Sequence, residues 1–343
     1  MGTAADSHPK GRANSRSSPL SIQRLSLRVL LFGGAIAAAL VVVHGVAGEV
    51  VSYNLGLCLI VYVAAIGLHI LVNWTGDLSL AHAQIVGLSA ISVGQLAISW
   101  KVSPIYLTPL GAAIGFATGA LIGLPALRAR GVQVAIITLA AGVAINRFLF
   151  TQSWLTLGFG TVPTPRLGPW TLDSSATLLP VCTAFAAAAT ILGWILFHSR
   201  TARAWYWIRE DASGAAAYGI FVNGYRTFAY GVAGSFAGLA GALFAMWVRN
   251  FGSESFTSSQ SFTYLLIVVI AGPGFLTGVL MSAGGFEAGT LFLSGGTVIS
   301  YLGPVLLIFN VTRYPGGING INREMVERYR TWAATRSMIK SAS

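Results

Sequence analysis

Apolar runs of about twenty residues, the length that spans a hydrocarbon core of about 30 Å as a helix, alternate with short polar connections along almost the whole chain. Each run therefore predicts one membrane-spanning helix. The predicted helices cover residues 29–47, 51–73, 78–99, 104–124, 132–152, 176–197, 227–247 and 287–309. The pattern predicts an all-α polytopic membrane protein with about eight full transmembrane helices.

A ninth apolar stretch, residues 263–283, contains a sequence that breaks helices. Ala271, Gly272, Pro273 and Gly274 follow one another near its middle, and proline and glycine there would end a helix at membrane depth. The stretch is either a re-entrant segment that returns to the side it came from, or two short tilted helices. The total is then eight to ten helices, and both alternatives keep the same parity.

The positions of Lys and Arg give an orientation, because basic residues are retained on the cytoplasmic side. With the N-terminus inside, the inner face receives Lys10, Arg12, Arg16, Arg24, Arg28, Arg128, Arg130, Arg200, Arg203, Arg209 and Arg226. The outer face receives Lys101, Arg166 and Arg249. We expect a disordered cytoplasmic tail over 1–24, a permease domain over 25–312 with a cytoplasmic loop at 198–226, and a basic cytoplasmic tail over 313–343.

Composition supports the membrane assignment and excludes a nucleic-acid partner. Charged residues are 9% of the chain, against about 25% in soluble domains. The net charge of +11 comes from residues between the apolar runs, whereas a nucleic-acid site needs Lys and Arg clustered on one surface. Cys58 and Cys182 both lie inside apolar runs, so we expect buried thiols and no metal site or disulfide.

An unusually polar segment opens the predicted helix 78–99. Thr75, Asp77 and Ser79 have side chains that can cap a helix N-terminus. His82 and Gln84 lie deeper, and such groups inside a membrane face a cavity or a partner helix. Two roles stay open for the segment: helix capping with helix–helix hydrogen bonding, or a solute pathway. The pathway candidates are Gly76, Asp77, Ser79, His82 and Gln84.

The loop 198–226 contains a helical pattern. Ile208, Ala212, Ala215 and Ala216 recur at helical spacing, which predicts one short amphipathic helix, and Gly219 is placed to end it. This helix either docks into a groove of a partner protein or floats at the headgroups, where Trp205 and Trp207 are suited to lie. Elsewhere, Gly234 and Gly238 form a small-xxx-small pattern that predicts close helix packing.

Several segments, in order along the chain, resemble the permease subunits of branched-chain amino acid ABC importers, the "M" type of the LIV system. They are residues 76–83 (GDLSLAHA, with Ala81 where the family has glycine), 127–131 (LRARG), 135–139 (AIITL), 208–211 (IRED) with Ala215, Ala216, Gly219 and Ile220, 238–243 (GLAGAL), 253–256 (SESF) and 313–317 (RYPGG). Together they extend over most of the chain.

The resemblance implies a multi-pass protein of a bacterial cell membrane that is not itself an enzyme. Its implied partners are a second homologous permease subunit, two cytoplasmic ABC ATPase subunits, an extracytoplasmic solute-binding protein and membrane lipid. It implies that Ile208, Arg209, Glu210, Asp211, Ala215, Ala216 and Gly219 couple the permease to the ATPase. The solute would be a branched-chain amino acid or a related small polar solute such as urea or a short amide.

The chain contains no G-x-x-x-x-G-K-[ST] sequence with which to bind ATP phosphates. We therefore expect no cofactor on this chain, and ATP to be used by partner subunits. A gradient-driven secondary transporter is the alternative, but its usual acidic pairs are reduced here to Asp77 and Glu287. An enzyme is disfavoured because the sequence offers no catalytic triad and His44 and His69 lack metal-ligand spacing.

Overall fold

Long apolar helices make up most of the structure, a computed structural model that describes residues 49–129, 131–152, 155, 161–274 and 276–292. Within these ranges six helical segments are long and apolar enough to cross a membrane: Glu49–Thr75, His82–Trp100, Pro104–Ala126, Val132–Leu149, Ser175–Phe197 and Val222–Val248. The prediction of an all-α polytopic membrane protein is confirmed. The predicted helix 29–47, most of the predicted helix 287–309 and both predicted tails lie outside the described residues.

Each crossing segment is one helix or a composite of two. The composites are α2 (Glu49–His69) with η1 (Ile70–Thr75), η2 (Pro104–Leu107) with α4 (Thr108–Ala126), and α5 (Val132–Ala144) with η3 (Ile145–Leu149). The single helices are α3 (His82–Trp100), α7 (Ser175–Phe197) and α10 (Val222–Val248). The shorter elements are α8 (Arg200–Glu210), α9 (Ala212–Ala217), η4 (Ser253–Ser255), α11 (Ser258–Ala271), α12 (Thr277–Phe292) and a hairpin of β1 (Arg166–Leu167) and β2 (Trp170–Thr171).

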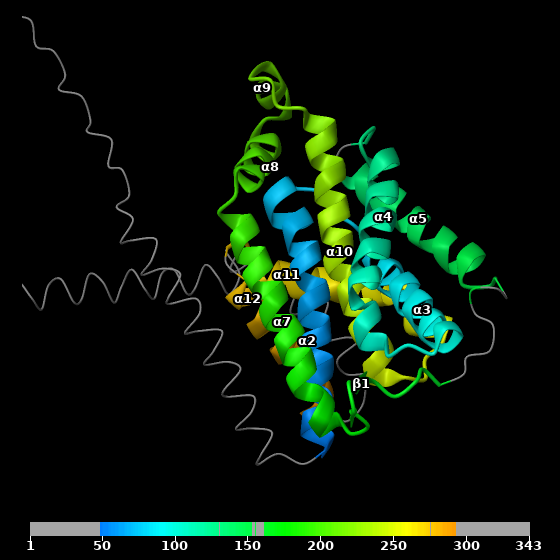
Figure 1. Cartoon of the computed structure of the whole chain (residues 1–343). Coiled ribbons are helices and arrows are strands. Elements are labelled where there is room, and N and C mark those ends of the chain that lie inside the picture. Colours follow the sequence, from blue (N-terminus) through cyan, green and yellow to red (C-terminus); the bar gives the residue numbers. More distant parts are fainter. Residues whose placement is uncertain (1–48, 130, 153–154, 156–160, 275, 293–343) are drawn as a thin grey trace, which may run out of the picture. The chain divides into compact units, whose positions relative to one another are not determined.

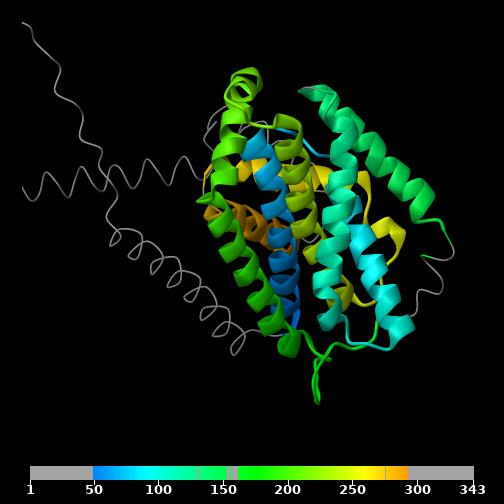
Figure 2. The ribbon, with the colours of Figure 1, turned by 45° about the horizontal axis from the view of Figure 1, so that its top comes forward.

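Helix α10 is central, because it packs against α4, α3 and α2 (Figures 1 and 2). Glycines allow the closest of these contacts: a Cβ on Gly234 would overlap the backbone oxygen of Gly115, and one on Gly238 would overlap that of Gly111. Ser89 of α3 joins the same contact by donating to Gly238 O at 2.7 Å and to Gly111 O at 3.1 Å. The prediction of a close-packing pair at Gly234 and Gly238 is confirmed.

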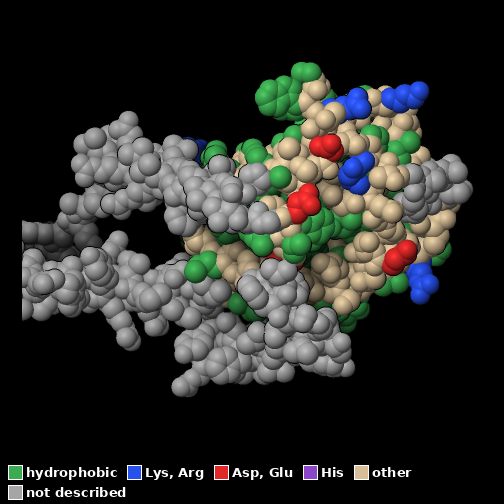
Figure 3. Space-filling view, turned by 90° about the horizontal axis from the view of Figure 1, so that it is seen from below, with side chains coloured by type: hydrophobic (Ala, Val, Ile, Leu, Met, Phe, Trp, Pro, Cys, Tyr) green, Lys and Arg blue, Asp and Glu red, His purple; other side chains and the backbone are tan. Residues whose placement is uncertain are grey.

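Alternating spans bring the predicted inner connections to one end and the outer connections to the other. At the first, which we call the α8 end, Arg226 pairs with Asp77. At the second, the β1 end, Arg166 N donates to Ser103 Oγ at 2.9 Å and Val162 N donates to Arg249 O at 2.9 Å. Figure 1 shows α8 and α9 at the top and β1 at the bottom. Figure 3 shows the molecule from below, with the few charged side chains scattered rather than clustered.

The predicted break in the ninth apolar stretch is present. Helix α11 ends at Ala271, and α12 begins at Thr277. Gly272 and Gly274 have φ of 72° and 156°, which favour glycine. The predicted start of a separate helix at 287 is wrong, since α12 runs unbroken from Thr277 to Phe292. Glycine inside a helix costs only about 1 kcal/mol, so Gly284 and Gly285 do not end it.

Candidate coupling surface and buried polar turn

The polar turn, residues 76–81, separates two spans at the α8 end. It begins where η1 ends, with Gly76 in the left-handed region at φ 78°. Helix α3 begins only at His82, and its N-cap Ala81 has no side-chain cap. The expectation that Thr75, Asp77 and Ser79 cap a helix beginning at 78 is therefore wrong. Thr75 Oγ1 instead donates back to Leu71 O at 2.7 Å.

Asp77 binds an arginine of α10 rather than a helix terminus. Arg226 Nε donates to Asp77 Oδ2 at 3.0 Å, and Arg226 Nη2 donates to Asp77 Oδ1 at 2.6 Å. The side chains of Arg226 and Asp77 are only 13% and 8% exposed, so the pair is largely removed from water. Helix α10 begins at Val222 rather than at the predicted 227, because this ion pair allows Arg226 to lie within its first turns.

Deeper polar residues of this region join helices to one another. His82 Nε2 lies 2.8 Å from Ala64 O of α2. Gln84 Oε1 accepts from Ser261 Oγ of α11 at 3.2 Å, and Leu80 N donates to Thr138 Oγ1 of α5 at 3.0 Å. Helix–helix hydrogen bonding by His82 and Gln84 is therefore confirmed. The turn and the start of α3 contact α2, α5, α10 and α11.

Most of the five predicted solute-pathway residues are buried in the structure. Asp77, Ser79, His82 and Gln84 are all buried. Gly76 is exposed, and a Cβ on it would meet Arg209 Cγ of α8 at 3.1 Å. The candidates thus share one region of the chain, and their role in a pathway stays a prediction.

The predicted amphipathic helix of the 198–226 loop is two helices. Asp211 lies between α8 and α9 with extended backbone, φ −152° and ψ 101°. Its Oδ1 accepts from Ser213 N at 3.0 Å and from Ser213 Oγ at 2.6 Å. An N-cap aspartate stops the preceding helix and starts the next one, which explains the difference. The hydrogen bond from the Ser213 side chain is the main cause that lowers the pKa of the Asp211 carboxyl.

The two tryptophans of α8 have different environments. Trp205 is fully buried, its ring centroid lies 6.1 Å from that of Phe228, and its Nε1 donates to Tyr225 O at 2.8 Å. It also lies 6.2 Å from Trp74 of η1. Trp207 is 57% exposed. A headgroup position for Trp205 is therefore wrong, because this side chain anchors α8 to η1 and α10.

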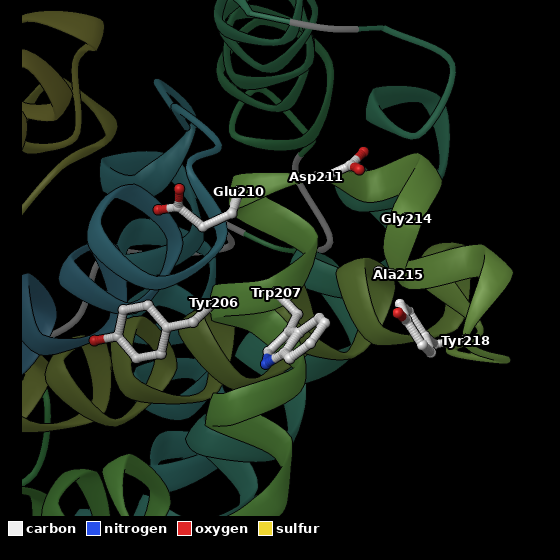
Figure 4. A pocket seen from close by; sticks show the side chains of 7 residues that line it. All are labelled: Tyr206, Trp207, Glu210, Asp211, Gly214, Ala215 and Tyr218. Atoms are coloured by element: carbon white, nitrogen blue, oxygen red, sulfur yellow. The ribbon is translucent and has the colours of Figure 1, made fainter. Parts of the chain in front are cut away.

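A shallow groove of about 450 Å³ runs between α8 and α9. It is lined by Tyr206, Trp207, Glu210, Asp211, Gly214, Ala215 and Tyr218. Figure 4 shows the aromatic side chains on one side of it and the two carboxylates on the other. The Trp207 and Tyr218 rings meet edge to face at 5.8 Å. The groove therefore offers an apolar floor beside two negative charges.

The predicted coupling residues divide between this groove and the body of the protein. Glu210, Asp211 and Ala215 line the groove. Ile208 is buried, and Ala216 and Gly219 are exposed. Gly219 has φ 81°, and its N–H donates to Ala216 O at 3.0 Å, so its predicted role in ending the helix is confirmed.

Arg209 does not line the groove and contacts η1 instead, although the residue is exposed. Its Nη1 donates to the backbone oxygen of Asn73 in η1. Sequence reasoning missed this contact, as it missed the Trp205 anchor and the Asp77–Arg226 pair. The pair could have been suspected, because a carboxylate and an arginine at two connections on the same side invite pairing. The Arg209 contact, made to a backbone oxygen, leaves no such signal.

Among the described residues, no group of three or more His, Cys, Asp or Glu side chains could hold a metal ion. Cys58 and Cys182 are free and buried, which confirms the expectation of buried thiols.

Comparison with known proteins assigns the family. The family model described as "Branched-chain amino acid transport system / permease component" matches residues 50–310. Two similar proteins are each named "High-affinity branched-chain amino acid transport system permease protein LivM". The one from Salmonella typhimurium (strain LT2) is 27% identical over 257 residues, which cover 66% of this chain and 59% of that protein.

The one from Escherichia coli (strain K12) is 27% identical over 259 residues, which cover 66% of this chain and 60% of that protein. The chain thus spans about three fifths of the length of these relatives. No solved structure matches it. With a family match over 50–310 and membrane-spanning helices throughout the described part of that range, the chain belongs to the permease components of branched-chain amino acid transport systems.

Proposed function

We propose that the chain is the membrane-spanning subunit of an ATP-driven importer for branched-chain amino acids or a related small polar solute such as urea or a short amide. The observation that carries this is the family match over residues 50–310. The proposed partners are a second homologous permease subunit, two cytoplasmic ABC ATPase subunits and an extracytoplasmic solute-binding protein. ATP is then hydrolysed by the ATPase subunits, and this chain binds no cofactor.

The proposed docking site for the ATPase is the α8–α9 groove. Its apolar floor, formed by Trp207, Tyr218 and Ala215, is desolvated when a partner covers it, and Glu210 and Asp211 favour basic residues beside it. Trp205 fixes α8 on the ends of η1 and α10, so a force on the groove acts directly on two spans. This geometry supports transmission of ATPase movement to the membrane helices.

The proposed topology has the α8 end and both termini in the cytoplasm. Eight full crossings with a broken ninth segment satisfy this, and the Gly272–Gly274 break supports the broken segment. The proposed solute pathway passes the polar turn and the start of α3, where Gly76, Asp77, Ser79, His82 and Gln84 lie. Its support is that polar side chains gather where this membrane span begins and four of the five are buried, as expected of polar groups that face a cavity or a partner helix.

The test is uptake of radiolabelled leucine by vesicles that contain the full complex with its binding protein. We expect uptake to require ATP. Glu210→Ala and Trp207→Ala should reduce ATP-dependent uptake, and Arg203→Ala, an exposed change on the same helix outside the groove, should not. Competition with unlabelled urea and acetamide distinguishes the solute classes. Uptake that persists without ATP and collapses with the ion gradient would establish the secondary-transporter alternative instead.

A further inference from the structure

Three hydrogen bonds link α8 to the break between α11 and α12. Arg209 Nη1 donates to the backbone oxygen of Asn73. The Asn73 side chain bonds His69 with 3.0 Å between Nδ2 and Nδ1. His69 in turn bonds Gly274 with 3.2 Å between Nε2 and the backbone oxygen. We call this chain the Arg209–Gly274 relay.

The chemistry of the groups fixes the direction of each bond. An amide nitrogen only donates, so His69 Nδ1 must accept from Asn73. The neutral ring then carries its hydrogen on Nε2, which donates to Gly274 O. His69 is fully buried and Asn73 is 8% exposed, so water has little access to replace a lost partner. A displaced member therefore leaves a buried polar group unpaired, at a cost of about 1–3 kcal/mol.

The far end of the relay is the short non-helical connection between α11 and α12. Gly274 lies between α11 and α12, next to Gly272 and Pro273, and outside both helices. Its oxygen is therefore not committed to a helical ladder. The part of the relay nearest α8 also has unusual backbone geometry, because Asn73 lies in the π-helical turn η1 (Ile70–Thr75). A π-helical turn has one more residue per hydrogen-bonded ring than an α-helix and is frequent at functional sites.

We propose, on the basis of the proposed function, that Asn73 and His69 are positioning residues that pass a displacement of α8 to the Gly272–Gly274 connection. When the ATPase moves α8, Arg209 shifts the backbone of η1. The Asn73 side chain turns the His69 ring with it, and the ring pulls on Gly274 O. The orientation of α12 relative to α2 then follows the state of the ATPase.

The experiment compares coupling, not activity alone, in vesicles that hold the complete complex. Leucine uptake and ATP hydrolysis are both measured, and their ratio is the readout. Asn73→Leu removes the amide and keeps the backbone oxygen that Arg209 binds. His69→Leu removes the next link, and His69→Gln restores one donor and one acceptor. Tyr62→Phe is the matched control: it removes one hydrogen bond of buried Tyr62 in α2, made to Thr190 at 2.9 Å, outside the relay.

We expect Asn73→Leu and His69→Leu to keep ATP hydrolysis while uptake per ATP falls at least about fivefold, the lower range of measured coupling between sites. His69→Gln should recover part of the ratio, and Tyr62→Phe should leave it unchanged. Uptake and hydrolysis that fall in parallel, or a Tyr62→Phe variant that behaves like His69→Leu, would overturn the proposal. Wild-type vesicles without ATP-dependent uptake would refute the proposed function itself, which is a separate result.

A second measurement tests the movement directly and does not depend on the amount of uptake, so it also applies to variants that assemble poorly. The exposed Pro273 is replaced as Pro273→Cys, and its rate of reaction with a maleimide is followed with and without ATP, while the buried Cys58 and Cys182 stay unreactive. We expect ATP to change this rate at least about fivefold, the same lower range, and Asn73→Leu to abolish the change. A rate that still responds to ATP in Asn73→Leu would show that the movement does not pass through the relay.

Discussion

Arg226 holds both carboxylate oxygens of Asp77, at 3.0 and 2.6 Å, although 149 residues separate the two in the chain. This pair joins the polar turn to the first turns of α10, the helix at the centre of the bundle. Both side chains are largely buried, so each one makes the other's charge tolerable. The turn and α10 are thus fixed to each other at the α8 end.

Removal of one partner should be worse than removal of both. Asp77→Leu leaves a buried arginine unpaired, and loss of one partner of a buried pair costs about 3–5 kcal/mol. The Asp77→Leu/Arg226→Leu double variant should recover much of this loss, because no uncompensated charge remains. Thermal unfolding in detergent gives the comparison, with the exposed Arg203→Leu as control. A double variant as unstable as the sum of the singles would show that the two side chains act independently.

Trp205 and Trp207 should separate anchoring from docking. Trp205→Ala empties a fully buried position and should destabilise the chain by about 3–5 kcal/mol. Trp207→Ala changes an exposed side chain in the groove, so the midpoint of unfolding should hardly move. Co-purification of the ATPase subunits should instead weaken with Trp207→Ala. Equal unfolding midpoints for the two variants would contradict the environments described for them.

Gly234 and Gly285 allow a matched test of close packing. Gly234→Ala places a Cβ against the Gly115 backbone, and forcing atoms into a packed contact costs about 1–3 kcal/mol. Gly285→Ala meets no atom within 4 Å in the described structure and should be neutral or stabilising by up to about 1 kcal/mol. Unfolding midpoints of the two variants check this. A Gly234→Ala midpoint equal to that of Gly285→Ala would refute the close contact between α4 and α10.

Asp211 should titrate below its usual range, because bonds from Ser213 favour the charged form and lower its pKa. A carboxyl with a lowered pKa in the folded state stabilises that state at neutral pH and loses this effect as the pH falls through the lowered pKa. Ser213→Ala should raise the pKa of Asp211 toward the ordinary value of about 3.9. Carboxyl ¹³C chemical shifts measured against pH follow the titration. An unchanged midpoint in Ser213→Ala would exclude the Ser213 hydroxyl bond as the cause.

The periodicity of apolar residues predicted the spans well, because a hydrocarbon core demands long apolar helices whatever their packing. The break at Gly272–Gly274 could also be predicted, since glycine and proline end a helix through their own backbone properties. The starts of α3 and α10 were displaced by four and five residues, from 78 to His82 and from 227 to Val222. Tertiary contacts lie at both places, the Leu80–Thr138 hydrogen bond before α3 and the Asp77–Arg226 pair at the start of α10, and local sequence does not contain them.

The candidate site likewise combines features that local sequence predicts with features that depend on tertiary contacts. Gly219 was predicted correctly because a positive φ has a local signature in glycine. The split between α8 and α9 could have been predicted as well, since aspartate is among the preferred N-cap residues, but the helical spacing of Ile208 and Ala212 hid it. The different contacts of Arg209 and Glu210 could not be predicted, because neighbours on a helix differ by about 100° in direction and only the position of η1 shows which of the two meets it.

Asp211 is the single residue between α8 and α9, and its extended backbone bears on how the α8–α9 groove can fit a partner. Trp205 fastens α8, and α9 follows after this one residue and its cap of two hydrogen bonds, although α9 also packs against α10. A small rotation about that residue would change the width of the groove while Trp205 keeps α8 in place. Under the proposed function, the groove would adapt in this way to the two surfaces that an ATPase offers before and after hydrolysis, while Trp205 still carries the force from α8 to η1 and α10.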